Sequence, residues 1–196
     1  MARIVVGISG ASGIILAHRL ILKAASLGHE ISILMTSTSL LTARVELGQE
    51  YATPQKFLKS FPDIVQKNIT LYNINDFLAP IASGTCLFDS VVVIPCSMTT
   101  LSAIAMGLSD NLLRRVCDIG FKEGRKVVLV PRELPFSVIH LENMLKIAKV
   151  GGVIIPPQPA WYMNPKTLED IENIIVGRVL DALGIPNEYP RWKHMN

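Results

Sequence analysis

Ile4-Val5-Val6-Gly7-Ile8-Ser9-Gly10-Ala11-Ser12-Gly13 joins a short apolar run to a loop of small residues. The run from Ile4 to Ile8 predicts a buried strand, and apolar residues from Ile14 to Leu27 recur at helical spacing until Gly28. Small residues let a backbone approach a phosphate, and a helix start offers free N–H groups and a positive dipole end. The stretch therefore predicts a strand–loop–helix unit that either binds a phosphate or only makes a tight turn. Its glycine spacing favours neither dinucleotide nor Walker-type binding.

Short apolar runs alternate with helical segments along the rest of the chain. We expect strands at 30–35, 69–72, 90–95, 126–130 and 152–155, and helices at 40–47, 54–60, 99–106, 110–123, 138–149 and 167–183. The run at 90–95 is apolar on both faces, as interior strands of parallel sheets are. We predict one α/β domain over residues 1–196, a doubly wound parallel sheet of the Rossmann or flavodoxin type in three layers. Ligands of such sheets lie beyond the carboxyl ends of the strands.

The composition excludes a disordered chain and gives no support to nucleic-acid binding. Hydrophobic residues make up 49% of the sequence and charged residues 18%, which predicts a surface partly covered by other subunits of a homo-oligomer. The net charge of +3 is modest and the basic residues form no single run, although a local cationic pocket for a phosphorylated substrate stays possible.

The location expected from the sequence is the cytoplasm. The three cysteines form no Cys-x-x-Cys pair, which fits free thiols in a reducing compartment. Arg3 and the apolar stretch after it resemble a signal peptide, but glycines interrupt the stretch and no cleavage site follows. No window reaches the roughly 18 apolar residues of a membrane span.

Hydroxyl and thiol side chains follow two of the predicted strands. Thr36 to Ser39 could contact a ribityl chain or a phosphate, but capping of the next helix is the better interpretation for most of them. Glu46 lies beyond and would by default be a solvated carboxylate. Cys96, after the strand at 90–95, is interpreted as a small buried side chain rather than a nucleophile, because no histidine is placed to activate it.

Charged residues cluster at other points of the pattern. Arg132 and Glu133 follow a strand between two prolines, and we interpret them as functional rather than as a surface ion pair. Arg115 and Lys122 lie seven apart and share a helix face, whereas Arg114 and Asp118 lie four apart and predict a salt bridge. Tyr162 and Arg178 add a phenol and another cation. No histidine spacing or Asp-rich motif suggests a metal.

These motifs together closely resemble the UbiX-type flavin prenyltransferases over essentially the whole chain. Besides the glycine loop, the resemblance is carried by Ala82-Ser83-Gly84-Thr85, Pro95-Cys-Ser-Met-x-Thr-Leu101, Arg132-Glu-x-Pro135, Ile139-His-Leu-Glu-Asn-Met-Leu145, Pro157-x-Pro159-x-x-Tyr162 and Gly177-Arg-Val-Leu-Asp181.

The resemblance implies an enzyme that prenylates reduced FMN with dimethylallyl phosphate. Two bonds form, to flavin N5 and C6, and the prenylated FMN serves a decarboxylase of the UbiD type, usually in ubiquinone biosynthesis. The family needs no metal, so cationic side chains must hold the leaving phosphate. It forms dodecamers, and we expect the tail at about 185–196 to pack on a neighbouring subunit.

The resemblance also implies roles for individual residues. Those contacting FMN would be Gly10, Ala11, Ser12, Thr36, Ser97, Met98, Thr99, Thr100 and Arg132. Those contacting dimethylallyl phosphate would be Tyr162 and Arg178, supported by Arg115 and Lys122. Glu133 would handle protons during ring closure with help from Ser12, and Glu46 and Trp192 match further active-site positions, the last reaching in from a neighbouring subunit.

Three positions depart from the family pattern without removing a catalytic group. Thr36 stands where Ser is common, Thr99 where Lys is frequent and Trp161 where Phe is frequent. They bear on prenyl specificity and flavin fit rather than on the class of reaction. Whether the donor is the monophosphate or the pyrophosphate stays open.

Two other functions compete with this one. Flavoproteins that decarboxylate cysteine-type substrates carry a Pro-x-Met-Asn-x-x-Met-Trp motif, which Pro159-Ala-Trp-Tyr-Met-Asn164 does not match, and an active-site His that has no equivalent between His29 and His140. A non-catalytic flavin carrier is the other alternative. Glu133 and the cations argue against it, because FMN alone would not need so many.

Overall fold

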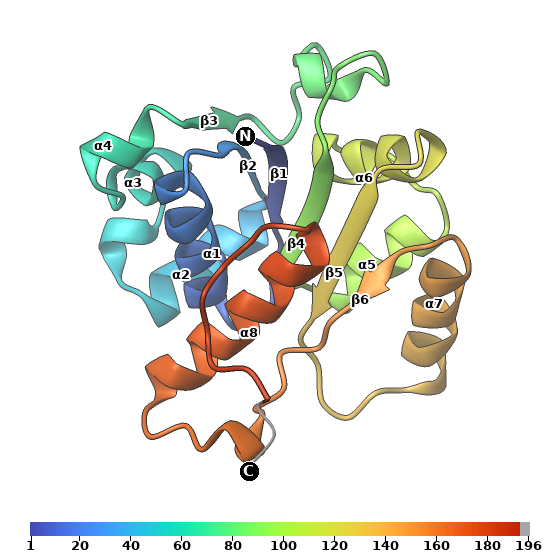
Figure 1. Cartoon of the computed structure of the whole chain (residues 1–196). Coiled ribbons are helices and arrows are strands. Elements are labelled where there is room, and N and C mark those ends of the chain that lie inside the picture. The colour runs from blue at the N-terminus through green and yellow to red at the C-terminus, as the bar shows by residue number, and fades with distance from the viewer. Residues whose placement is uncertain (193–196) are drawn as a thin grey trace.

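Six parallel strands form one sheet in the computed structural model, which describes residues 1–192 (Figure 1). Their order across the sheet is β3-β2-β1-β4-β5-β6. The strands are β1 (Arg3–Ile8), β2 (Glu30–Met35), β3 (Ile69–Tyr72), β4 (Ser90–Cys96), β5 (Lys126–Pro131) and β6 (Val153–Ile154). The parallel sheet predicted from the sequence is confirmed, and each predicted strand lies within one or two residues of the observed one.

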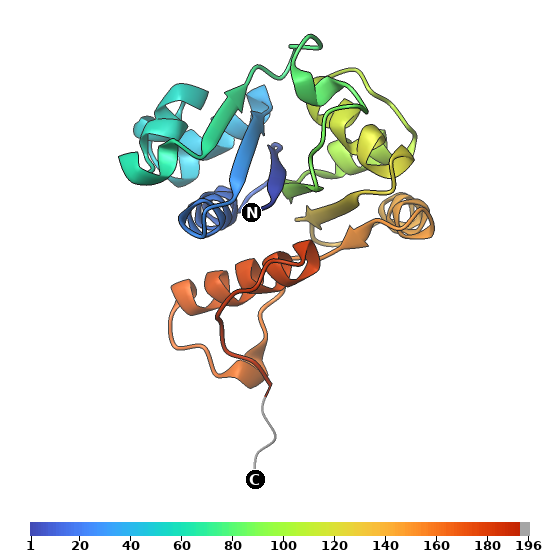
Figure 2. The ribbon, with the colours of Figure 1, turned by 45° about the horizontal axis from the view of Figure 1, so that its top comes forward.

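Helices cover both faces of the sheet, as a doubly wound fold requires. One face packs against α1 (Ile14–Ser26), α3 (Pro54–Lys59), α4 (Asp63–Gln66) and α8 (Leu168–Leu183), and the other against α5 (Met98–Ala105), α6 (Leu112–Lys122) and α7 (Val138–Lys149). Figure 2 shows α1 and α8 on one side of the sheet and α6 on the other. The remaining elements are α2 (Ser37–Glu46) and the 3₁₀ turns η1 (Gln49–Tyr51), η2 (Pro80–Ala82) and η3 (Trp161–Met163).

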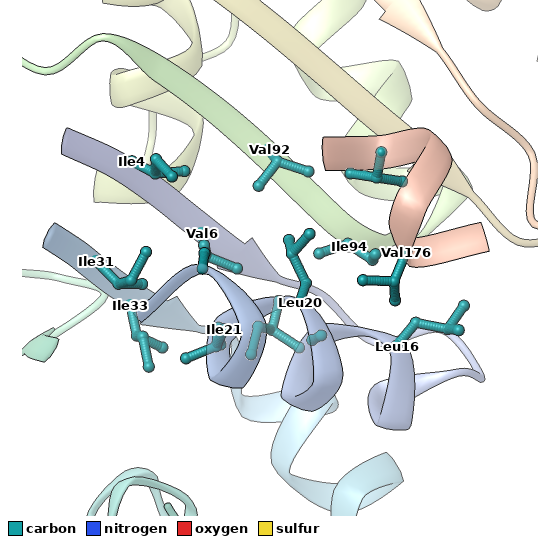
Figure 3. Close-up of a cluster of buried hydrophobic side chains, with 14 of the residues drawn as sticks. Ile4, Val6, Leu16, Leu20, Ile21, Ile31, Ile33, Val92, Ile94 and Val176 are labelled. Atoms are coloured by element: carbon teal, nitrogen blue, oxygen red, sulfur yellow. The ribbon is translucent and has the colours of Figure 1, made fainter. Parts of the chain in front are cut away.

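Alternation along β1 divides the core into two clusters. Ile4, Val6 and Ile8 belong to the cluster with α1 and α8, whereas Val5 belongs to the cluster with α6. Leu20 of α1 lies among the side chains of this first cluster in Figure 3. Because this apolar face holds α1 flat on the sheet, the start of α1 is fixed at the carboxyl end of β1.

Two details of the sequence-based prediction are wrong. α2 begins at Ser37 rather than near Leu40. The reason is that the Thr36 side chain accepts the N–H of Ser39, which makes Thr36 the N-cap and starts the helix three residues before the predicted start. The predicted salt bridge between Arg114 and Asp118 does not form. Arg114 instead pairs with Asp110 at 2.7 Å, and Asp118 pairs with Arg115 at 2.9 Å. Several partners lie within one helical turn of these residues, and spacing alone does not choose among them.

The tail folds back onto its own chain. Residues 185–192 run along α8, and four residues of the segment predicted to meet a neighbouring subunit, 193–196, lie outside the described residues. A contact of the tail with a neighbour therefore stays a prediction. No helix within residues 1–192 is long and apolar enough to cross a membrane.

Candidate functional site

The carboxyl ends of four neighbouring strands bring their loops into one row. Backbone hydrogen bonds continue past the strands: the Thr36 N–H donates to the Ile8 carbonyl at 3.1 Å, the Ser9 N–H to Pro95 at 3.2 Å, and the Arg132 N–H to Cys96 at 3.2 Å. The loops after β2, β1, β4 and β5 are thus neighbours in that order. From β1 the chain continues to β2 and β3 on one side, whereas from β4 it continues to β5 and β6 on the other side. The boundary between β1 and β4 is therefore the topological switch point, where doubly wound sheets bind ligands.

Ser9 ties the two central loops together. Its side chain is fully buried, and its hydroxyl donates to the Pro95 carbonyl at 3.1 Å while accepting the Ser97 N–H at 2.7 Å. No local sequence pattern marks Ser9 as a bridging residue, because its hydrogen-bond partners lie more than 80 residues away along the chain. Its place directly after β1 was the only available signal.

Gly10 is required by a close approach between loops. A Cβ at this position would overlap the side chain of Thr38, at the start of α2. The Thr38 hydroxyl lies 3.0 Å from that of Thr36, so the loops after β1 and β2 present a continuous polar surface. Thr36 caps α2, which confirms the capping interpretation of this segment.

The start of α1 is already occupied by an anion, the carboxylate of Glu46. Its oxygens accept the N–H groups of Gly13 at 3.1 Å and Ile14 at 2.9 Å. The expectation that these N–H groups are free for a ligand phosphate is therefore wrong in this structure, and Glu46 is more than a solvated carboxylate. The physical reason is that a helix N-terminus attracts negative charge, and the end of α2 supplies it from within the chain.

The start of α5 offers further polar groups in the same row of loops. Ser97 caps the helix by accepting the Thr100 N–H at 3.2 Å, and its hydroxyl donates to that of Thr100 at 3.0 Å. Thr99 is exposed next to them, and Met98 is buried. Cys96 is fully buried, and burial raises the pKa of its thiol far above the usual range. The interpretation of Cys96 as a small buried side chain is confirmed.

Arg132 and Glu133 stand at the carboxyl end of β5 with their charges exposed. Within residues 1–192 neither forms an ion pair, so the surface-pair interpretation finds no support there. A Glu133 oxygen accepts only the N–H of the next residue, Leu134, at 3.0 Å. Both side chains are therefore available to a ligand at this row of loops.

Tyr162 and Arg178 line a second hollow at the same edge of the sheet. This hollow has a volume of about 150 Å³ and lies between α8 and the segment that follows β6, with Ile155 and Pro156 forming part of its wall. The ring of Trp192 packs edge-on against Tyr162, with 5.4 Å between the ring centroids. Phenol, guanidinium and indole are thus gathered in one chain.

Arg115 and Lys122 lie elsewhere. α6 packs on the face opposite α8, and Lys122 precedes the amino end of β5, whereas Glu133 follows its carboxyl end. A strand of six residues spans about 20 Å, which separates the two ends. Arg115 donates to the Ala82 carbonyl at 3.3 Å, in the segment that leads to the amino end of β4. One chain therefore does not bring these two cations to Tyr162 and Arg178.

The row of loops has groups that suit the phosphate of a planar cofactor. The starts of α2 and α5 direct partial positive charge toward this row, and Arg132 adds a full charge, whereas Glu46 already neutralises the start of α1. Gly10 leaves room for close approach, and the hydroxyls of Thr36 and Ser97 add polar groups. The hollow at Tyr162 is a separate space that the guanidinium of Arg178 helps to line. Within residues 1–192, no group of three His, Cys, Asp or Glu residues could hold a metal.

Comparison with known proteins identifies the class. The family model of the flavoproteins matches residues 1–180. The flavin prenyltransferase UbiX of Chlamydia muridarum is 45% identical over 99% of both chains. The crystal structure of AnUbiX in complex with FMN and dimethylallyl pyrophosphate superposes with a TM-score of 0.88 at 36% identity, covering 100% of this chain and 99% of that one. A dodecameric FMN-dependent UbiX-like decarboxylase from Escherichia coli gives 0.85 at 38% identity, covering 98% and 100%.

Fold and site thus define an FMN-binding flavoprotein. Within that class, the chain belongs to the family of UbiX flavin prenyltransferases, which are transferase enzymes. The resemblance seen in the motifs is confirmed over the whole length.

Gly10→Ala should weaken FMN binding strongly, by about tenfold or more, because the added methyl group forces the loops after β1 and β2 apart. Titration of the purified variant with FMN, followed by flavin fluorescence, measures the effect. Gly124→Ala is the matched control: Gly124 has φ +67°, so alanine strains the backbone there without meeting any neighbour. Equal FMN affinity in Gly10→Ala and the parent protein would contradict the assignment of this loop.

Proposed function

We propose that this chain transfers a dimethylallyl group from dimethylallyl phosphate to N5 and C6 of reduced FMN. The observation that carries the proposal is the pairing of two anion sites at one sheet edge, with Glu133 exposed in the same row of loops. One site suits the phosphate of FMN and the other suits the phosphate of the donor. A carrier of FMN would need only the first.

The proposed flavin site consists of the loops at the switch point. Gly10, Ala11 and Ser12 would line the flavin, Thr36 and Arg132 would contact it from β2 and β5, and the start of α5 would add its contacts. This last group comprises Ser97, Met98, Thr99 and Thr100. With Glu46 on the start of α1, we propose that the N–H groups of Met98 and Thr99 at the start of α5 donate to the phosphate.

Tyr162 and Arg178 would hold the donor phosphate. When the allylic C–O bond breaks, its electron pair leaves with the phosphate, and fixed donors near the departing oxygens stabilise that charge. The reduced flavin supplies the two nucleophilic positions. We propose that this enzyme needs no metal, so that side chains alone stabilise the leaving phosphate.

Glu133 would move the protons. Forming bonds from one allyl unit to N5 and to C6 releases a proton from each flavin position and adds one to the alkene carbon between them. An exposed carboxylate beside Arg132 can accept and return such protons, and the Ser12 hydroxyl lies exposed in the same row of loops.

Arg115 and Lys122 would serve the site of a neighbouring subunit. Their side chains are 34% and 49% exposed. They lie on the face of the sheet opposite α8, so they do not reach the Tyr162 hollow of their own chain. The same face carries exposed apolar residues of α7, which are Val138, Ile139, Leu141 and Leu145. Such an apolar patch supports a homo-oligomer, for which we propose the dodecamer known from the Escherichia coli relative, with Trp192 at a subunit boundary.

The product would serve a decarboxylase of the UbiD type, and we propose the cytoplasm as the place of the reaction. The partner enzyme and the location are both inferred from the family to which the chain belongs. The competing cysteine-type decarboxylation loses support because Glu133 and the Tyr162 hollow match the prenyltransferase motifs instead.

Purified protein given dithionite-reduced FMN and dimethylallyl phosphate under anaerobic conditions should yield a flavin heavier by one isoprene unit in mass spectrometry. A parallel reaction with dimethylallyl pyrophosphate decides the donor. If FMN is bound but its mass stays unchanged with both donors, the protein is a carrier and the proposal fails.

Glu133→Gln should bind FMN as the parent protein does but form the finished four-ring product about a hundredfold more slowly, because the amide cannot exchange protons. Stopped-flow absorbance and mass spectrometry of the extracted flavin follow the reaction. Glu30→Gln alters an exposed glutamate at the opposite edge of the sheet and should turn over normally. Parent-like turnover of Glu133→Gln would remove this carboxylate from the mechanism.

Subunit mixing tests whether sites are shared. Arg115→Ala and Arg178→Ala should each be nearly inactive, but their co-expression should restore part of the activity, because some sites then receive both wild-type cations. Co-expression of Arg115→Ala with Lys122→Ala is the control: both residues lie on α6, so every site lacks one of them. Recovery only in the first mixture supports shared sites, whereas no recovery in either places all cations of a site in one chain.

A further inference from the structure

Asp181 holds the tail of the chain against α8. Its carboxylate accepts hydrogen bonds from the Tyr189 hydroxyl at 2.5 Å, from Asn187 Nδ2 at 3.0 Å, and from both terminal nitrogens of Arg191 at 2.8 Å. Three side chains of one short segment thus converge on a single carboxylate. We call these four residues the Asp181 clamp.

The ionisation states of Asp181 and Tyr189 favour the hydrogen bonds of the clamp. Hydrogen bonding to Arg191 lowers the pKa of Asp181 to about 2, so the carboxylate is charged at neutral pH. Burial, followed by the contact with Asp181, raises the pKa of the Tyr189 phenol, which therefore keeps its proton and donates it. The charge-assisted bonds of Arg191 and Tyr189 are the stronger kind of hydrogen bond.

Two further contacts fix the course of the tail. The Tyr189 ring lies so close to Gly177 that a Cβ at this position would overlap it. The tail therefore packs on α8 at a position where the helix has a glycine. Lys23 Nζ of α1 donates to the Glu188 carbonyl at 2.8 Å. The segment from 187 to 191 is therefore anchored on two helices.

The clamp ends directly at the donor hollow. Trp192 follows Arg191, and its ring packs on Tyr162 at 74° between the ring planes. Tyr162 belongs to the short turn η3 and is itself 63% exposed, and the side-chain hydrogen bonds of residues 1–192 include none from its hydroxyl. The aromatic contact with Trp192 restrains this ring, and Trp192 directly follows Arg191 of the clamp.

We propose that Asp181 is a positioning residue for donor binding, which sets Tyr162 through Tyr189, Arg191 and Trp192. It touches neither flavin nor donor. The proposal rests on the proposed function in one respect, that Tyr162 binds the donor phosphate. A tail free to move would leave Tyr162 in many orientations, and ordering it would cost binding free energy each time the donor binds.

Asp181→Asn tests the proposal, because the amide keeps the shape but loses the charge that holds Arg191. We expect KM for dimethylallyl phosphate to rise about tenfold, with kcat within about twofold and FMN affinity unchanged. In a Trp192→Ala background the same substitution should add less than about twofold, because the path to Tyr162 is already cut. Full additivity of the two substitutions would overturn the proposal.

Asp170→Asn is the matched control. Asp170 is also a half-buried, hydrogen-bonded aspartate of α8. Its carboxylate accepts the N–H groups of Lys166 and Thr167 at 2.9 Å, and these bonds hold the start of α8 rather than the tail. This variant should lose thermal stability without raising KM. A similar rise of KM in both variants would show that any weakening of α8 has the same effect, and the positioning role would be wrong.

Fluorescence anisotropy gives a readout independent of activity. Trp161 and Trp192 are the two tryptophans, so Trp161→Phe leaves Trp192 as the single reporter. In this background Asp181→Asn should add a fast anisotropy decay, and unchanged decay would overturn the clamp even if prenyl transfer is not observed. A fast decay with unchanged KM in an active enzyme would refute positioning while leaving the proposed function intact.

Discussion

The hydroxyl of Ser9 joins the two halves of this fold at the point where they diverge. It bonds to Pro95 and Ser97 from the end of β1, so the loop that leads to α1 and the loop that leads to α5 are held edge to edge. Buried hydroxyls in such a position are costly to leave unpaired, which makes the arrangement stiff. Every group assigned to the flavin site is placed relative to this junction, either in the two loops or in the strands next to them.

Electrostatics at the junction follows from the same geometry. Three helices start beside it, and their positive ends would repel one another without an anion nearby. The chain provides one anion itself, since Glu46 caps α1. A phosphate is the natural partner of the remaining N–H groups and of Arg132. We therefore propose that Glu46 affects ligand binding indirectly, because it leaves the starts of α2 and α5 for the phosphate.

The two edges of the sheet divide the cations of the proposed reaction. Arg132 and Arg178 stand at the carboxyl edge, whereas α6 carries Arg115 and Lys122 toward the amino edge on the other face. The motif Ala82-Ser83-Gly84-Thr85 lies beside these two, since Arg115 bonds to Ala82. An assembly that brings the two edges of different subunits together would unite them. Oligomerisation would then be part of the catalytic site and not only a source of stability.

The sequence by itself determined the parallel sheet, the position of nearly every strand and helix, and the family. Apolar runs that alternate with helical periods leave few other ways to bury the chain, and small residues after β1 mark the ligand edge. Only the tertiary structure decided that Ser9 bridges β1 and β4, that Glu46 occupies the start of α1, that Arg114 pairs with Asp110, and that the tail is held by Asp181. The physical reason is that these contacts depend on where whole elements come to rest. Local patterns report which residues form an element, whereas the partner of a single polar side chain is chosen among many equally spaced candidates by the packing of the entire sheet.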